Sequence, residues 1–227
     1  SVSEYLSRNI LESYPNLNEH ITIAHPGIKI QPTSDEKIAK LRRNFREKYN
    51  IPTFTFVLLF VAHGFKRKGL SAIIKALETL NNKNIHIVVA GSGNPKDIKI
   101  ESPTVQSNTH FVGTVKDMNK LYPVADALIH PTLGDTYGMV VLEAMSHKLP
   151  VIVSSAKYCG FSEHLNGDNA LIISNPKDLN ELAKYIKILY SQVELRDKIA
   201  ENGLQKSQTI SWENTTKNTL DAYEKIL

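Results

Sequence analysis

The chain has 227 residues, of which 41% are hydrophobic and 22% charged, and its formal net charge is +4. This composition is typical of a globular protein and excludes a fibre or a largely disordered chain. The length suits one large α/β domain or two small ones. No apolar run approaches the roughly 20 residues that span a bilayer, and the N-terminus has no signal-peptide pattern. We therefore expect a cytoplasmic protein.

The single cysteine, Cys159, excludes an internal disulfide and favours a reducing compartment. We expect it to be a small packing residue rather than a nucleophile. The chain starts at Ser1 without Met, and its first residues are typical of a segment within a protein. We expect the sequence to be part of a longer protein.

Apolar runs alternate with helical stripes along the chain. The predicted strands cover 21–24, 54–61, 85–90, 110–112, 127–130, 151–153 and 171–173. The predicted helices cover 35–49, a short segment at 117–122, segments beginning near Gly69 and Gly138, and a segment with Pro176 in its first position. The alternation predicts an α/β fold, a doubly wound Rossmann-like parallel sheet, whose ligands bind at the carboxyl ends of the strands.

One acid stands alone on the helix after Gly138, because Glu143 is the only charge in a segment that is apolar on every side. Such a helix is buried, and a buried carboxylate needs hydrogen bonds, which ligand hydroxyls would supply. Asp135 precedes the helix, whose first amides, at Gly138, Met139 and Val140, form a natural phosphate site. The alternative is that Asp135 caps the helix and Glu143 is satisfied within the core.

A turn with three consecutive cations follows the apolar strand at 54–61. Gly64 lets the backbone approach a ligand, and a lysine neutralises phosphate charge. Three neighbouring cations cannot all face the strand ends, so only some of them are expected to contact a phosphate. The alternative is an exposed basic turn without a ligand.

Two motifs carry a resemblance to a known family. The run D-T-Y-G-M-V-V-L-E-A-M resembles the E-x7-E motif of retaining family-4 glycosyltransferases of the GT-B fold, with Asp135 in place of the first Glu. The patterns F-V-x-x-x-F-x-R-K-G and C-G-F-S-E-H are most similar to those of the bacterial lipopolysaccharide-core glucosyltransferase branch. The resemblance covers nearly the whole chain, as the donor-binding half of a two-domain enzyme.

The resemblance implies a role for each candidate residue. Glu143 would bind the ribose hydroxyls of a sugar nucleotide, and Asp135 would face the donor sugar. The diphosphate would be bound mainly by Lys68, then by Arg67, with Lys66 in solvent. The turn at Gly64 and the amides of Gly138, Met139 and Val140 would complete its site. Backbone groups around Val115 would contact the base. Lys68, Asp135 and Glu143 are the implied catalytic residues.

The resemblance also implies a domain plan and an activity. Residues 1–20 would be an interdomain segment, 21–208 the donor-binding domain and 209–227 a crossover helix, with the N-terminal acceptor domain outside this chain. The implied enzyme is a hexosyltransferase that moves a hexose, such as glucose from UDP-glucose, to a saccharide or glycolipid acceptor in lipopolysaccharide or other cell-surface polysaccharide synthesis. No aspartate pair suits a metal, so no metal and no cofactor are expected. We expect this chain alone to be inactive.

Other features leave alternatives open. The basic helix at 35–49 exposes its charges to solvent as an ordinary surface helix. The alternative is that these charges attract the protein to the inner face of an anionic membrane or to an acidic glycolipid. Glu163 and His164 form an acid–base pair or are structural. A non-catalytic sugar-nucleotide-binding module is the alternative function. A Rossmann dehydrogenase is disfavoured by the incomplete glycine fingerprint at 91–93, and no nucleic-acid motif is present.

Overall fold

A parallel sheet forms the centre of the computed structural model, which describes residues 1–29 and 33–224, apart from the side chains of 18–20. Within these residues the sheet has six strands in the order β3-β2-β1-β4-β5-β6. The strands are β1 (Phe56–Val61), β2 (Ile85–Ala90), β3 (Thr109–Gly113), β4 (Ala127–His130), β5 (Val151–Ser154) and β6 (Leu171–Ile173). The order reverses between β1 and β4, which is the switch point of a doubly wound sheet. The predicted Rossmann-like fold is confirmed.

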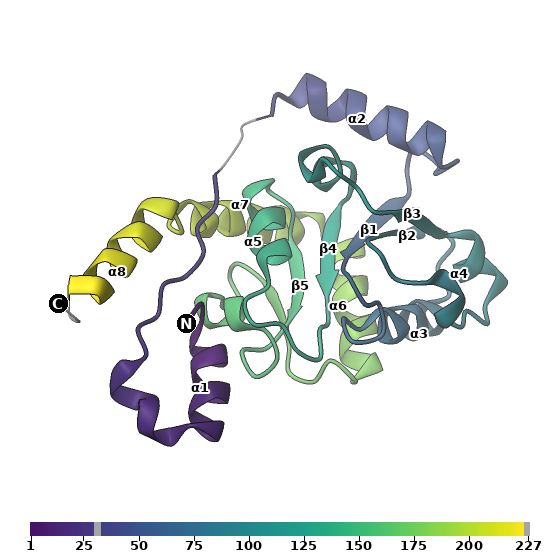
Figure 1. Cartoon of the computed structure of the whole chain (residues 1–227). Coiled ribbons are helices and arrows are strands. Elements are labelled where there is room, and N and C mark those ends of the chain that lie inside the picture. The colour runs from purple at the N-terminus through teal and green to yellow at the C-terminus, as the bar shows by residue number, and fades with distance from the viewer. Residues whose placement is uncertain (30–32, 225–227) are drawn as a thin grey trace.

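The uninterrupted apolar run of β1 places this strand at the centre of the sheet, between β2 and β4. Alternate side chains enter two separate cores, because successive residues of a strand point to opposite faces. Leu58 packs with α3 (Leu70–Leu80) and α6 (Leu179–Ser191), and Leu59 packs with α5 (Met139–Ser146). Both β1 residues are fully buried, as a central parallel strand requires. Figure 1 shows these helices around the strands.

The predicted strand at 21–24 is wrong. These residues have no regular structure, and their backbone bonds to the N-terminus of the chain instead of to the sheet: Ala24 N–H donates to Ser1 O at 2.9 Å, and the amino group of Ser1 donates to Thr22 O at 2.7 Å. Among the described residues, the segment is not part of the sheet, whose edge strands are β3 and β6.

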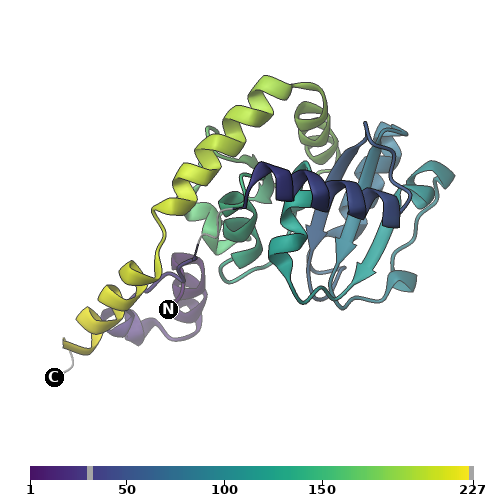
Figure 2. The ribbon, with the colours of Figure 1, turned by 90° about the horizontal axis from the view of Figure 1, so that it is seen from above.

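Three helices were not predicted, and one begins later than predicted. The three are α1 (Glu4–Ser13), α4 (Pro103–Ser107) and α7 (Val193–Gln208). Helix α6 begins at Leu179 rather than at Pro176, because Asp178 is the N-cap and its carboxylate accepts the amides of Asn180 and Glu181 at 2.9 and 3.0 Å. The closing helix is α8 (Trp212–Glu224), which extends away from the sheet (Figure 2). The segment at 117–122 forms two short 3-10 turns, η3 (Met118–Lys120) and η4 (Tyr122–Val124).

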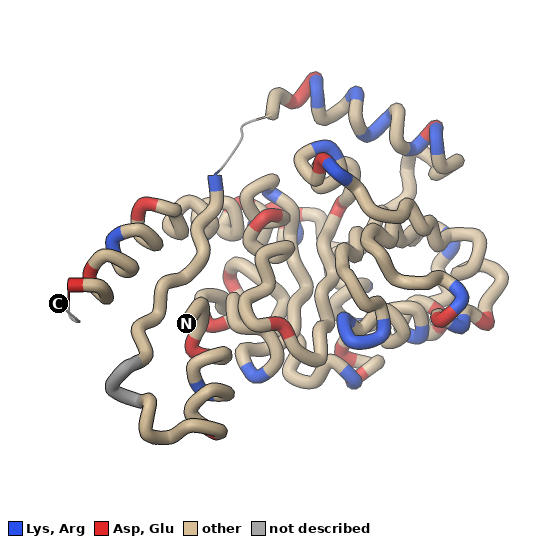
Figure 3. The backbone as a smooth tube through the Cα atoms, viewed as in Figure 1, with Lys and Arg blue, Asp and Glu red and all other residues tan. Residues whose placement is uncertain are grey.

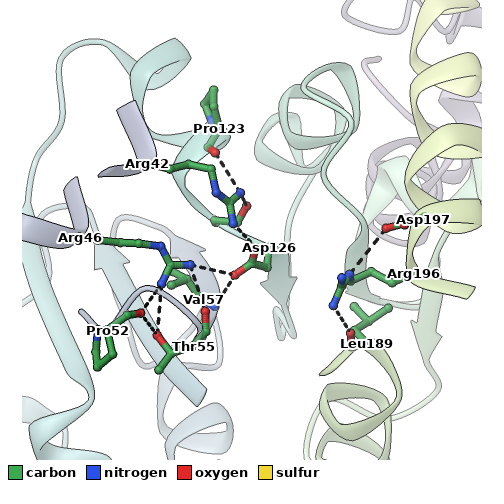
Figure 4. A network of polar contacts seen from close by, with 11 residues as sticks. Arg42, Arg46, Pro52, Thr55, Val57, Pro123, Asp126, Leu189, Arg196 and Asp197 are labelled. Carbon is green, nitrogen blue, oxygen red and sulfur yellow. Dashed lines mark hydrogen bonds and ion pairs between the residues drawn. The ribbon is translucent and has the colours of Figure 1, made fainter. Parts of the chain in front are cut away.

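The basic helix α2 (Asp35–Lys48) is fixed to the sheet by two of its arginines. Asp126, just before β4, forms ion pairs with Arg42 and Arg46 and accepts the amide of Val57 at 2.7 Å (Figure 4). Arg46 also donates to Thr55 O at 3.0 Å and is buried. Burial lowers the pKa of Arg46, and Asp126 opposes that shift. The helix is therefore not simply a solvated face.

The other cations of α2 remain exposed. Figure 3 shows Lys and Arg along the whole helix, which lies at the top of the view. The exposed cations are Lys37, Lys40, Arg43 and Lys48, and they are interspersed with Asp35, Glu36 and Glu47. Along the described residues, no helix is both long and apolar enough to cross a membrane.

Candidate functional site

A cavity of about 440 Å³ opens where β1, β2 and β4 end, and its lining includes Val61, Ala90 and His130 from those three strand ends. Eight of the nine predicted site residues line it: Arg67, Lys68, Val115, Asp135, Gly138, Met139, Val140 and Glu143. Gly64 is not among the lining residues but lies next to His63, which is. The structure therefore brings together residues that are up to 76 positions apart, from Arg67 to Glu143.

The turn after β1 presents its cations unequally. Gly69 has φ +90°, and a Cβ there would lie 2.1 Å from Pro131 O, so the turn packs directly on the loop after β4. Lys68 is consequently buried and lines the cavity. Arg67 is exposed, lines the cavity and donates to Gly134 O at 2.6 Å. Lys66 is exposed and lies outside the lining.

Two ionisable side chains hold the Asp135 carboxylate. Lys68 Nζ forms an ion pair with Asp135 Oδ2, and His130 Nε2 lies 3.0 Å from the same oxygen. Burial alone would raise the pKa of Asp135, but His130 and Lys68 hold it well below its usual range. Asp135 is therefore a carboxylate that can only accept hydrogen bonds.

Complete burial lowers the pKa of His130, and this effect outweighs the opposing effect of Asp135, so the neutral form is favoured. Its Nε2 faces a carboxylate, so that nitrogen carries the hydrogen and donates. Nδ1 of His130 is then an acceptor, and this buried atom has no hydrogen-bond partner among the described residues. His130 was not predicted as a site residue, because it stands inside an ordinary apolar strand.

The N-terminus of α5 forms the opposite side of the site. Gly138 is its N-cap with φ +98°, and a Cβ there would lie 2.6 Å from the buried Cys159 Sγ, so only glycine fits. The first amides of a helix have no acceptor within the helix. Since Met139 and Val140 line the cavity, the anion site expected from the sequence adjoins Lys68 and Arg67.

Glu143 lies in the second turn of α5, half-buried on the cavity wall. The helix is otherwise mostly buried, as its apolar sequence predicted. The Tyr122 hydroxyl donates to Glu143 Oε2 at 2.5 Å. The sequence did not predict this partner, because the two residues lie on different elements.

Glu163 and His164 do not line the cavity. The Glu163 carboxylate binds Arg8 at 2.8 Å and accepts the Glu4 amide at 3.2 Å, which fixes α1 to the domain. The His164 ring packs edge-on against His25 at 4.4 Å between centroids. Their contacts favour structural roles.

Among the residues that the structure describes, no group of three or more His, Cys, Asp or Glu side chains is arranged to hold a metal ion. The free Cys159 is buried, and burial raises its pKa to about 12, as for a packing residue.

Comparisons with known proteins agree on one family. Residues 42–206 match the family described as Glycosyl transferases group 1. Lipopolysaccharide glucosyltransferase WaaG of Escherichia coli (strain K12) is 30% identical over 202 residues, which cover 86% of this chain and 54% of WaaG.

Solved structures share the fold. A crystal structure of WaaG, a glycosyltransferase involved in lipopolysaccharide biosynthesis, has a TM-score of 0.81 at 27% identity, over 97% of this chain and 60% of that one. Anabaena Alr3699/HepE in complex with UDP and glucose has a TM-score of 0.77 at 18% identity, over 100% of this chain and 61% of that one.

The chain thus spans between 54% and 61% of the length of these relatives. Its central parallel sheet and the cavity at the strand ends fall within or beside the matched residues. Because the family match extends from residue 42 to residue 206, the chain belongs to the group 1 glycosyl transferases.

Proposed function

We propose that this chain binds a nucleoside-diphosphate sugar as the donor of a retaining hexosyl transfer. One observation carries the proposal: Lys68, Arg67, the N-terminus of α5 and Glu143 line the same cavity. Cations and free amides suit a diphosphate, and a carboxylate acceptor suits the hydroxyls of a ribose. The HepE structure, named as a complex with UDP and glucose, supports UDP-glucose as the first donor to test.

Each lining residue has a role in this proposal. Glu143 accepts the ribose hydroxyls, and Lys68 with Arg67 neutralises the diphosphate while the amides of α5 donate to it. Val115 adjoins the base and Asp135 faces the sugar. As the bond to the sugar breaks, charge grows on the departing diphosphate, so these fixed donors stabilise the transition state electrostatically.

The acceptor side of the reaction lies outside this cavity. Attack requires the acceptor oxygen to be held about 3 to 3.5 Å from the reacting carbon, and the relatives are longer than this chain. In our proposal a further acceptor domain supplies that geometry, and the acceptor is a saccharide or glycolipid of lipopolysaccharide or another cell-surface polysaccharide. The name of WaaG as a lipopolysaccharide glucosyltransferase supports this acceptor class.

Calorimetry tests the binding part of the proposal. UDP-glucose, ADP-glucose, GDP-mannose and NADH are titrated into the chain. Binding of one sugar nucleotide without NADH binding supports the proposal, whereas binding of NADH alone would replace it with the dehydrogenase alternative.

A transfer assay separates an enzyme from a binding module. The chain, with and without a longer protein that contains it, is incubated with radiolabelled sugar nucleotide and glycolipid acceptors. Labelled acceptor from the longer protein supports the transferase. Donor binding with no transfer by either form favours the non-catalytic module.

We also propose that the exposed cations of α2 attract the protein to an anionic membrane surface at the cytoplasmic face. Lys37, Lys40 and Arg43 support this, since each basic residue near such a surface contributes about 1 kcal/mol. Co-sedimentation with vesicles of anionic or neutral lipid tests it. Equal sedimentation with both would reject the membrane contact.

A further inference from the structure

Tyr122 is a fully buried tyrosine, 1% exposed, whose one polar atom faces the cavity wall. It lies on η4, and its hydroxyl donates to Glu143 Oε2 at 2.5 Å. Tyr122 is not among the lining residues, so it touches no bound nucleotide directly. Any effect it has on a ligand passes through Glu143.

The backbone around Tyr122 is held from the side of α2. Arg42 donates to the carbonyls of Pro123 and Ala125 at 3.3 and 2.9 Å, and its ion pair with Asp126 fixes the end of the same segment (Figure 4). The network of Arg42, Arg46 and Asp126 therefore anchors η4 to the start of β1 and β4. A hydroxyl on so fixed a segment has a defined position.

The aromatic ring is held from the side of α5. His147, just after α5, packs against Tyr122 with 5.1 Å between ring centroids. Nδ1 of His147 lies 2.9 Å from the carbonyl oxygen of Glu143. The ring and the carboxylate that it contacts are thus packed against the same turn of helix.

The direction of the hydrogen bond follows from the chemistry of the pair. Burial raises the pKa of Tyr122 far above its ordinary value, and the Glu143 charge raises it further. The phenol is consequently protonated and donates. Each carboxylate oxygen has two lone pairs, so one bond from Tyr122 leaves Oε1 and the second lone pair of Oε2 for ligand hydroxyls.

We propose that Tyr122 is a positioning residue, which holds the Glu143 carboxylate in the orientation that binds the ribose hydroxyls. This inference rests on the proposed function, because it assumes that Glu143 contacts the ribose. Without the hydroxyl, Glu143 samples other rotamers, and the site loses its preference for a ribonucleotide over the matching 2′-deoxyribonucleotide. Affinity for the 2′-deoxyribonucleotide stays nearly unchanged, since that ligand depends less on Glu143.

The test measures the dissociation constants of UDP and 2′-deoxy-UDP by calorimetry for the wild-type chain and for Tyr122→Phe. We expect the wild type to bind UDP more tightly than 2′-deoxy-UDP. In Tyr122→Phe the ratio of the two dissociation constants should fall about tenfold, as for the loss of one hydrogen bond to a charged group. Tyr122→Met is a second variant that removes the hydroxyl and keeps an apolar side chain. Tyr185→Phe is the matched control, because Tyr185 lies beside Glu181 on α6, outside the cavity.

A double-mutant cycle with Glu143→Ala separates positioning from general damage. If Tyr122 acts through Glu143, Tyr122→Phe has no further effect on UDP affinity when Glu143 is already alanine. An additive effect, or an unchanged UDP preference in both Tyr122 variants, overturns the inference while the Glu143 assignment stands. Two other outcomes would reject the proposed uridine-nucleotide site and this inference with it. In the first, the wild type binds neither UDP nor 2′-deoxy-UDP; in the second, its preference for UDP does not depend on Glu143.

Discussion

Lys68 and Asp135 form an ion pair that joins the turn after β1 to the loop after β4. The Lys68 side chain is only 11% exposed, so its ammonium has a carboxylate partner before any ligand enters. His130 contacts the same carboxylate oxygen and keeps Asp135 in place. In the proposed function, a diphosphate would compete with Asp135 for Lys68, which distinguishes this lysine from a cation of an exposed basic turn.

We expect Lys68→Ala to weaken UDP binding at least about tenfold and uridine binding little, because a charge-assisted hydrogen bond to phosphate is lost. Lys66→Ala is the matched control, since Lys66 is exposed and outside the lining. Titration of uridine, UMP and UDP into each variant measures both effects. Equal losses in the two variants would mean that the turn acts as an unspecific basic patch.

We expect Glu143→Ala to weaken nucleotide binding by about tenfold or more, at roughly 1.5 to 3 kcal/mol for hydrogen bonds to a charged group. The fold should remain intact, because the side chain lies on the cavity wall and not in the core. Calorimetry gives the affinity, and circular dichroism checks the fold. Glu201→Ala, at a carboxylate 46% exposed on α7, is the control. Affinity equal to the wild type would reject the ribose assignment.

The strands and the place of the site were predictable because they depend on local patterns. An uninterrupted apolar run marks β1, and a run broken only by His86 marks β2. Gly69 and Lys68 mark the turn that faces the cavity. Parallel strands bring such ends to one edge of the sheet. The grouping of Lys68 with Asp135 and Glu143 follows from topology alone.

The partners of those residues were not predictable, because they depend on how separate segments pack. Tyr122 and Glu143 are 21 residues apart on different elements, and His130 resembles any residue of a short strand. Helix α7 was missed because its few buried residues, among them Ile199 and Gly203, give a weak apolar stripe. The false strand at 21–24 has a strand-like composition but no neighbour to pair with.

The buried His86 predicts that stability falls in acid. His86 Nδ1 lies 3.0 Å from His110 Nε2, across β2 and β3, and burial lowers the pKa of His86 to about 4, with His110 and Arg46 adding to the shift. An unfolded histidine titrates near pH 6.5. As the pH falls from about 6.5 to 4, the unfolded chain binds a proton that the folded chain does not, so folding free energy is lost in that window.

We expect His86 to account for a loss of roughly 2 kcal/mol in unfolding free energy between pH 7.5 and pH 5. Urea denaturation at both values measures it, and His86→Phe should reduce the loss. His63→Asn, at an exposed histidine, is the control and should keep the wild-type dependence. A loss that is equal in the wild type and His86→Phe would assign the acid sensitivity to other groups.

We expect Asp126→Ala to be the most destabilising of these changes, at about 3 kcal/mol, because it leaves the buried Arg46 without its counter-charge. The same change removes the acceptor of the Val57 amide at the start of β1 and one partner of Arg42. Urea denaturation at pH 7.5 measures the loss. Arg43→Ala, at an exposed arginine of the same helix, should stay within about 0.5 kcal/mol of the wild type. A loss below that of an ordinary surface change would mean that α2 is held by its apolar contacts, through Leu41 and Phe45, and not by the arginine network.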